Sequence, residues 1–347
     1  MTFAKLDYRK GVRALTALSA ASIVLAACGG GGSASGADAD GSVTLKLGHT
    51  LEADHPIVRC GVDVFSEKVS ELSGGSVEIK SYPAAQVGDE QEMADSVIAG
   101  DLDITQPSAG HLAEYHAPLS VLNAAFLFDD YTQLMDTARN ESGQALWDGL
   151  RDAVDVETVG IWAQGIRVVS TQDVEVRTPE DLKGVKMRAA DSPIWIANIT
   201  ALGASATPMA LGEVYTGLQQ GVVDAQENPV PTIASNKYNE VQNVISLTDH
   251  VVQGNPIIIN GAKWDSLTEE QRQAILDAAE ESEQSLLECL ETEAEEILDE
   301  WRNDPGMTVV EDVNREAFRE HAREYLVEKY DHEWQGAYDD IRSSLDQ

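Results

Sequence analysis

The sequence of 347 residues contains little cysteine, little positive charge and few long apolar runs. Its 3 cysteines exclude a disulfide-dense scaffold and are too few for a four-cysteine zinc site. Because 24 lysines and arginines face 60 acidic residues, the net charge is −36, which argues against a nucleic-acid partner. A hydrophobic fraction of 43% nevertheless provides enough apolar residues for about two folded domains of roughly 150 residues each.

The N-terminal segment has the organisation of an export signal. Basic residues precede an apolar stretch over 14–27, which is too short to span a bilayer as a helix, and no later stretch approaches that requirement. A Leu-Ala-Ala-Cys sequence that ends at Cys28 resembles a bacterial lipobox, although an ordinary signal peptide with a chance cysteine is the alternative. We therefore expect a signal peptide over 1–27, lipidation of Cys28, a flexible Gly/Ser/Ala-rich tether over 28–41, and an extracytoplasmic protein anchored to the cell membrane.

Beyond the tether, strand and helix patterns alternate along the chain. Strands are predicted at 43–47, 77–80, 102–104, 159–162, 167–169 and 185–188, and helices at 56–72, 88–99, 131–150 and in a segment that ends at 202. This alternation predicts α/β layers with mainly parallel strands. In such sheets a ligand binds in a crevice at the carboxyl ends of the strands.

A long helix is predicted near the C-terminus. Thr268 and Gln271 form a capping box, and apolar residues then recur at three- and four-residue steps from Ile275 to Trp301. An unbroken helix over 269–302 would be about 50 Å long, more than one small domain, so we expect it to cross two lobes. Two helices that meet near 282–285 are the alternative.

Sequence motifs for catalysis are missing. The histidines form no H-E-x-x-H pair, and the chain has no G-x-S-x-G, no phosphate-binding loop that ends in Gly-Lys-Ser/Thr, and no G-x-G-x-x-G after a strand. We therefore expect neither an enzyme nor a metal or cofactor. An exported α/β hydrolase, the alternative from another class, would need a nucleophile motif.

One window departs from the acidic character of the chain. Residues 162–188 hold five basic and four acidic side chains. Arg167 ends a predicted turn over 164–166, and Arg188 ends the predicted strand over 185–188. An arginine fork binds a carboxylate through two parallel hydrogen bonds, so both are candidate ligand contacts. The alternative for each is a surface ion pair with a neighbouring acid.

Several segments occur in an order that resembles one family, the solute-binding subunits of tripartite ATP-independent periplasmic (TRAP) transporters. They are Lys46-Leu47-Gly48-His49, Thr178-Pro179-Glu180-Asp181-Leu182-Lys183-Gly184, Lys186-Met187-Arg188, Leu202-Gly203-Ala204, Thr207-Pro208-Met209-Ala210, Leu218-Gln219-Gln220-Gly221 and Gln226-Glu227-Asn228-Pro229. The resemblance implies two α/β domains that close on a ligand by a hinge. It places lobe I at 42–164 plus 254–293 and lobe II at 165–253 plus 294–347.

The resemblance also implies the function and the site. The chain is expected to capture a small organic anion, a C4-dicarboxylate or alternatively a sugar acid or 2-oxo acid, and to deliver it to membrane permease subunits. The implied ligand contacts are a bidentate salt bridge from Arg188 and further contacts from Arg167, Asn228, Thr50, Ser108 and Leu211. Leu211 stands where relatives often place an aromatic ring.

Two cysteines remain, Cys60 and Cys289. Exported proteins keep few free thiols, which favours a disulfide. Both residues lie in helical patterns, however, and pairs on helices seldom meet the geometry of that bond. Two small buried side chains are the alternative.

Overall fold

The computed structural model describes residues 42–345. The expected signal peptide, the lipidation of Cys28 and the tether lie outside the described residues. Among the helices of the described part, none combines the length and apolar character that crossing a membrane requires.

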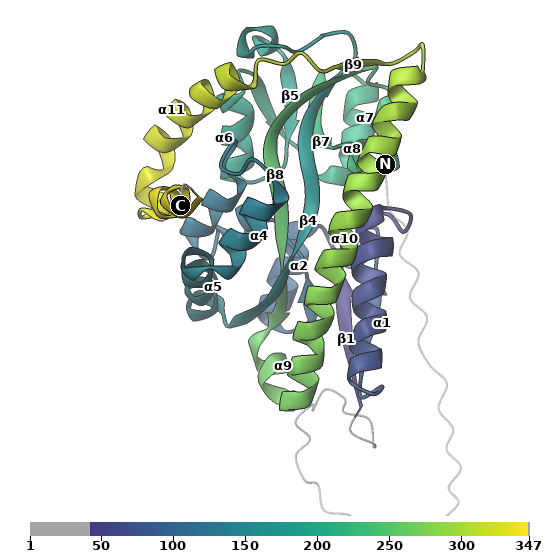
Figure 1. Cartoon of the computed structure of the whole chain (residues 1–347), viewed down its shortest axis with the longest axis vertical. Coiled ribbons are helices and arrows are strands. Elements are labelled where there is room, and N and C mark those ends of the chain that lie inside the picture. Colours follow the sequence, from purple (N-terminus) through teal and green to yellow (C-terminus); the bar gives the residue numbers. More distant parts are fainter. Residues whose placement is uncertain (1–41, 346–347) are drawn as a thin grey trace, which may run out of the picture. The chain divides into compact units, whose positions relative to one another are not determined.

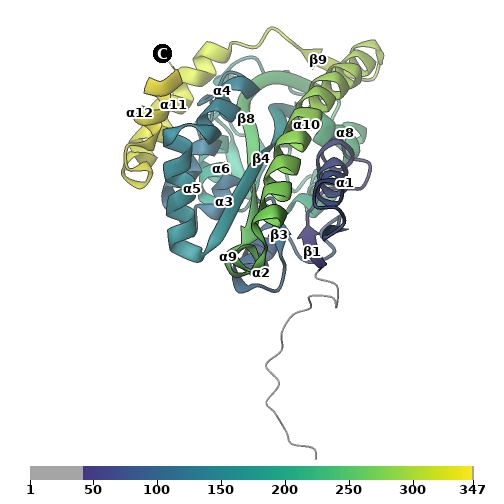
Figure 2. The ribbon, with the colours of Figure 1, turned by 60° about the horizontal axis from the view of Figure 1, so that its bottom comes forward.

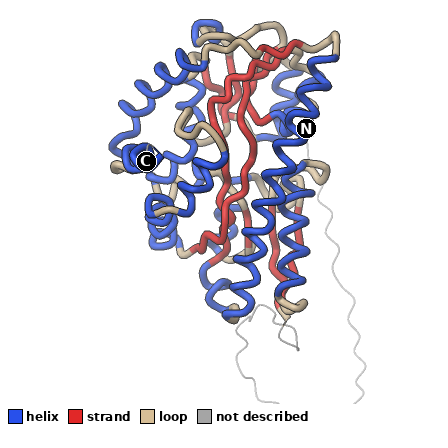
Figure 3. Tube along the Cα trace, in the orientation of Figure 1, coloured by secondary structure: helices blue, strands red, loops and turns tan. Residues whose placement is uncertain are grey.

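Within residues 42–345, nine strands form one mixed sheet in the order β2-β1-β3-β8-β4-β7-β5-β6, with β9 paired to β8 (Figures 1 and 3). The strands are β1 (Val43–Gly48), β2 (Val77–Tyr82), β3 (Ile104–Thr105), β4 (Val156–Thr171), β5 (Lys186–Ala189), β6 (Ser205–Pro208), β7 (Ala225–Pro229), β8 (Val244–Asn260) and β9 (Thr308–Val310). We call β2, β1 and β3 the first flank, and β7, β5 and β6 the second flank. Each flank is parallel where its strands pair with one another.

The two flanks are joined by β4 and β8, which run antiparallel over their whole length. The last residues of β8 pair with β3, whereas the last residues of β4 pair with β7, both antiparallel. The prediction of mainly parallel strands is therefore wrong for the centre of the sheet. The two short strands predicted at 159–162 and 167–169 are parts of β4, and β8 was not predicted at all.

Helices cover both faces of this sheet (Figure 2). The α-helices are α1 (Asp63–Leu72), α2 (Glu90–Ala99), α3 (Ala109–Leu112), α4 (Tyr131–Arg139), α5 (Glu141–Val154), α6 (Pro193–Ala201), α7 (Val214–Gln219), α8 (Val230–Ser235), α9 (Gly261–Ser266), α10 (Glu269–Asn303), α11 (Arg315–Trp334) and α12 (Ala337–Leu345). A π-helix, η1 (Ile57–Val62), precedes α1, and 3-10 turns are η2 (Ala117–Asn123), η3 (Pro179–Leu182), η4 (Leu211–Glu213) and η5 (Tyr238–Glu240). The helix predicted at 131–150 is two helices, because the Asn140 side chain accepts hydrogen bonds from two backbone amides and begins α5.

The long helix α10 is one unbroken element of 35 residues, so the two-helix alternative is wrong. The predicted capping box is present, with Thr268 and Gln271 bonding each other's backbone. In Figures 1 and 2 the helix crosses the face of β4, beside α1 and α8. Near its middle, the Ser282 hydroxyl accepts a hydrogen bond of 2.9 Å from the indole of the fully buried Trp162 on β4.

The two remaining cysteines are joined. Cys60 of η1 and Cys289 of α10 form a disulfide, so the alternative of two separate buried side chains is wrong. Helical spacing along the sequence could not reveal that η1 and α10 lie against each other. Beside this bond, Arg59 donates to both carboxylate oxygens of Glu293, at 2.6 and 2.7 Å.

Candidate functional site

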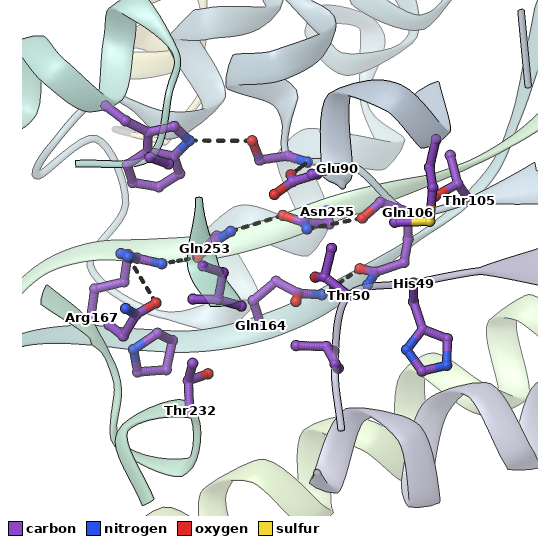
Figure 4. A pocket seen from close by; sticks show the side chains of 18 of the residues that line it. His49, Thr50, Glu90, Thr105, Gln106, Gln164, Arg167, Thr232, Gln253 and Asn255 are labelled. Atoms are coloured by element: carbon purple, nitrogen blue, oxygen red, sulfur yellow. Dashed lines mark hydrogen bonds between the residues drawn. The ribbon is translucent and has the colours of Figure 1, made fainter. Parts of the chain in front are cut away.

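A polar pocket lies where the ends of four strands meet the two long central strands (Figure 4). Its walls come from residues at or just after the carboxyl ends of β1, β3, β5 and β7, and from β4 and β8. The pocket holds about 650 Å³ of space that no atom fills, open solvent at its mouth included. This is the crevice position that parallel strands predict.

All six residues predicted to contact a ligand line this one pocket. They are Thr50, Ser108, Arg167, Arg188, Leu211 and Asn228. The first and last of them, Thr50 and Asn228, are 178 residues apart in the chain, and the sheet order brings all six together. The six residues therefore form one candidate site.

Arg188 is a buried cation that faces the pocket. It stands near the end of β5 with 4% of its surface exposed, and its Nε donates to the Met209 carbonyl at 3.0 Å. Burial lowers the pKa of its guanidinium, with the nearby Arg167 charge acting in the same direction. Since no described carboxylate forms an ion pair with Arg188, its charge is the one in the pocket that an anionic ligand would compensate.

Arg167 is compensated within the protein. Its Nε forms a buried ion pair with Glu227, and its Nη2 donates to Glu227 Oε1 at 2.8 Å and to Asn228 Oδ1 at 3.0 Å. The Arg167 guanidinium also lies 4.7 Å from the centre of the Trp195 ring. The alternative of an ion pair is thus correct for Arg167, but the pair is buried instead of exposed. The predicted turn before it is wrong, because residues 164–166 lie inside β4.

Glu227 is held by a second group behind Arg167. His250 on β8 lies with Nε2 at 3.0 Å from the Glu227 carboxylate, and both side chains are 1% exposed. Burial alone would raise the pKa of Glu227, but the Arg167 charge and the bonds from His250 and Arg167 lower it to about 2. The Arg167 end of the pocket is therefore a neutralised charge cluster.

A row of side-chain amides continues from Arg167 across the pocket (Figure 4). Arg167 donates to Gln253 Oε1 at 2.5 Å, so the Gln253 amide nitrogen points onward and donates to Asn255 Oδ1 at 2.9 Å. Asn255 in turn donates to the Gln106 carbonyl at 3.0 Å, and Gln164 donates to Gln106 Oε1 at 2.9 Å. Because Arg167 can only donate, it fixes the orientation of the amides that follow it.

The far wall contains a second ion pair, formed by Glu90 and His111 across 3.1 Å. Burial acts to raise the pKa of Glu90, yet the His111 charge and the bonds from His111 and Ser108 lower it to about 2. Burial acts to lower the pKa of His111, and Glu90 nevertheless raises it. Ser108 caps α3 and also contacts His111 at 2.8 Å.

Two of the predicted residues are less buried than the other four. Thr50 follows β1 and Leu211 begins η4, and both side chains are only partly buried. The leucine adds apolar surface near Arg188, while Trp195 of α6 provides the aromatic ring of this wall. Trp162, in contrast, is a core residue packed edge-on against Phe65.

Sequence reasoning missed several residues of the pocket lining. It did not identify Glu90, Gln106, Gln164, Gln253, Asn255 or Thr232, which all line the pocket. Prediction of β8 would have placed Gln253 and Asn255 two residues apart on one face of a strand that reaches the crevice. For the acid Glu90, one of 60 such residues, composition offers no signal.

The described residues offer little for a metal. The group whose ligand atoms lie close enough together is Cys60, Cys289 and Glu293, and its two sulfurs are already bonded to each other. This group lies outside the pocket lining.

Comparison with known proteins identifies relatives along most of the chain. Residues 47–333 match the model of the family described as bacterial extracellular solute-binding protein, family 7 (DctP). The chain is 32% identical to the 2,3-diketo-L-gulonate-binding periplasmic protein YiaO of Escherichia coli, over 73% of this chain and 77% of the relative. It is 31% identical to the C4-dicarboxylate-binding periplasmic protein of Rhodobacter capsulatus, over 69% and 72% of the two chains.

A solved structure is similar over nearly its full length. The TRAP periplasmic solute-binding protein of Roseobacter denitrificans, with bound 3-deoxy-D-manno-oct-2-ulosonic acid, matches with a TM-score of 0.82 and 27% identity. The match covers 87% of this chain and 99% of that protein.

Proposed function

We propose that this chain, which belongs to family 7 of the bacterial extracellular solute-binding proteins, the DctP family of TRAP transporters, binds a sugar acid with a single carboxylate. Proteins of this family bind small carboxylates outside the cytoplasm and perform no catalysis, as expected from the sequence. The two-domain α/β fold with its long helix is also the one predicted.

The distribution of charge in the pocket carries this proposal. Arg188 is the one lining arginine that forms no ion pair with a described carboxylate, although the charges of Glu227 and Glu90 act on it, and it gives a single strong site for a ligand carboxylate. From Arg167 onward the wall is built of amides and hydroxyls, which exchange hydrogen bonds with alcohol groups. A ligand with one carboxylate and several hydroxyls matches both regions.

The main prediction from the sequence, a C4-dicarboxylate, fits this pocket less well than its alternative, the sugar acid. The second carboxylate of a C4-dicarboxylate would need a second unpaired cation, but among the described lining residues Arg167 is already paired with Glu227, and the remaining ion pair presents the acid Glu90 with its partner His111. A carboxylate beside Glu90 would be repelled and desolvated together with it. The Escherichia coli relative and the Roseobacter structure, both with sugar acids in their names, support this choice over the dicarboxylate of the Rhodobacter relative.

The proposed mechanism is capture followed by closure of two lobes. We place lobe I at 42–164 plus 254–293 and lobe II at 165–253 plus 294–347. The register of β4 and β8 shifts between Ala163 and Gly165, next to this boundary. Gly165 has φ +127°, and a Cβ there would lie 2.4 Å from Pro229, so the bend requires glycine.

Delivery completes the proposed function. We propose that the loaded protein presents its ligand to the membrane permease subunits of the transporter. Lipidation of Cys28 would keep it at the membrane, and mass spectrometry of the mature N-terminus tests that step. An unmodified N-terminus at another residue would contradict the anchor while leaving ligand binding untouched.

A ligand panel tests the proposed specificity. The full mature protein is screened by thermal shift and then by calorimetry against hexonates, uronates, 2-oxo sugar acids and C4-dicarboxylates. We expect stabilisation by hydroxylated monocarboxylates and none in an Arg188→Gln control. Binding of succinate or malate without any response to the sugar acids would contradict the proposal.

A further inference from the structure

A hydrogen bond beside the pocket joins a segment that follows the first flank to one that follows the second. It involves a histidine that is not part of the pocket lining. His55 lies between β1 and η1 on the first flank and is fully buried. Its Nε2 lies 3.1 Å from the hydroxyl of Thr232, in α8 after β7 on the second flank. Thr232 itself lines the pocket (Figure 4).

The proton arrangement of this bond follows from its neighbours. The backbone amide of Ile57 donates to His55 Nδ1 at 3.1 Å, so Nδ1 is an acceptor and the ring proton of neutral His55 stands on Nε2. Burial, followed by the charges of His49 and Arg59, lowers the pKa of His55 to about 3, which keeps the ring neutral. His55 therefore donates to Thr232, and the Thr232 hydroxyl keeps its own proton for another acceptor.

The segment that carries His55 is fastened to the long helix at two points. The disulfide joins Cys60 of η1 to Cys289 of α10, and Arg59 bonds both carboxylate oxygens of Glu293 one turn further along that helix. Arg59 Nε also donates to the Asp54 carbonyl at 3.0 Å, directly before His55. The same helix contacts α8, which carries Thr232. His55 is thus held beside α10 by bonds that do not involve the second flank.

We propose that His55 and Thr232 form a latch between the lobes, which is made on closure and turns the Thr232 hydroxyl proton toward the ligand. The inference rests on the proposed function, because it requires lobes that close on a ligand. His55 is a positioning residue, since it acts on the ligand through Thr232. A bond made only in the closed state slows the release of ligand, whereas a bond present in both states contributes to stability alone.

Two substitutions at one position separate the latch from the local structure. Asparagine in His55→Asn keeps an acceptor for the Ile57 amide but is too short to reach Thr232, whereas glutamine in His55→Gln places an amide N–H near the position of Nε2. With the best sugar acid of the panel, we expect His55→Asn to raise the dissociation rate about three- to tenfold, and His55→Gln to restore much of the loss. The matched control is His321→Asn, whose ring bonds the Ala201 carbonyl away from the pocket lining.

The partner is tested in the same experiment. Thr232→Val removes the acceptor, and in a double-mutant cycle the pair His55→Asn and Thr232→Val should release ligand no faster than the more affected single variant. Multiplied effects in the cycle, or a parental dissociation rate for His55→Asn, would overturn the latch.

A readout other than sugar-acid binding separates this inference from the proposed function. If no sugar acid binds the parent protein, the proposed function fails, and NMR of the imidazole protons with whichever carboxylate of the panel does bind then decides on the latch. An Nε2 proton of His55 that exchanges slowly only when this carboxylate is bound, and that Thr232→Val exposes to exchange, supports the latch. A ring proton on Nδ1, or an Nε2 proton that is equally protected with and without the carboxylate, overturns it.

Discussion

The two sides of the pocket use different chemistry. Toward the second flank stand both arginines, Arg188 on β5 and Arg167 on the half of β4 that pairs with β7. Toward the first flank the wall is mostly amides and hydroxyls, with His49, Leu51 and Met93 among them. Its one lining acid, Glu90, is paired with His111. The side with the arginines therefore supplies binding energy through charge, and the side with the amides distinguishes ligands through the pattern of its hydrogen bonds.

Within the charged side, the two arginines also differ from each other. Arg167 has an internal partner in Glu227, and Arg188 has none among the described carboxylates. Arg167 is therefore expected to stabilise the fold, and Arg188 to bind the ligand.

The largest expected effect comes from breaking the internal pair. Arg167→Ala leaves the Glu227 carboxylate buried without its cation, and we expect the free energy of unfolding to fall by about 3–5 kcal/mol. Denaturant titration measures this loss. Adding Glu227→Gln to the variant should recover part of it, and a loss below about 1 kcal/mol would mean that Arg167 is not a structural partner.

Arg188→Met should lower the affinity for the ligand and leave the stability of the fold nearly unchanged. The variant removes a buried charge that the protein does not compensate, so stability should stay within about 1 kcal/mol of the parent. Affinity for the sugar acid should fall by about 2–5 kcal/mol, because the ligand carboxylate would be buried without a partner. Calorimetry tests the second part, and parental affinity would remove Arg188 from the proposed mechanism.

Acidification should weaken the fold through the first flank. Burial lowers the pKa of His49 to about 4 and that of His55 to about 3, from 6.5. Below pH 6.5 these two rings therefore bind protons in the unfolded chain but not in the folded protein, and the free energy of unfolding falls by up to about 1.4 kcal/mol per pH unit for each ring. The raised pKa of His111 acts in the opposite direction, but mainly above pH 6.5, because below that value its ring is protonated in both states. Glu90 and Glu227, both with a pKa lowered to about 2, add a further loss below pH 4.5.

Denaturant titrations from pH 7 to pH 4 measure this slope. His55→Asn should lose the share of the pH dependence that the buried neutral ring of His55 contributes. A flat profile between pH 6.5 and pH 5 would contradict the assignment of buried neutral rings.

The smallest expected effect concerns the amide wall. Gln106→Leu removes the acceptor of Gln164, and affinity for a sugar acid should fall by about 1 kcal/mol, or roughly fivefold. A short monocarboxylate that occupies only the arginine side should bind the variant as well as the parent. The exposed Gln273→Leu on α10 is the control, and equal losses for both ligands would contradict the division of labour between the two sides.

The arginine side of the pocket could be predicted from the sequence, whereas the amide side could not. In a chain with 60 acidic residues, Arg167 and Arg188 stand out, and motifs around Asn228 point to the same family. Amides carry no such contrast, and Gln253 and Asn255 lie in β8, whose buried run lacks the clear alternation of a half-exposed strand.

Long elements show what local patterns can and cannot reveal. The length and start of α10 were predictable because its capping box and apolar stripe are local signals. The joining of 159–162 and 167–169 into β4 was not, because that strand depends on its long-range pairing with β8. The disulfide was undecidable for the same reason, since its partners are 229 residues apart.

That bond also closes a covalent ring through the molecule. Every residue from Cys60 to Cys289 belongs to the ring, including both arginines, the whole amide row and all the strands between β2 and β8. A single cut of the backbone within these residues opens the ring but leaves the two pieces joined by the sulfurs. Except for His49, Thr50 and Leu51, the whole pocket lining is therefore carried on a closed loop of chain, and no one protease cleavage within that loop can detach it.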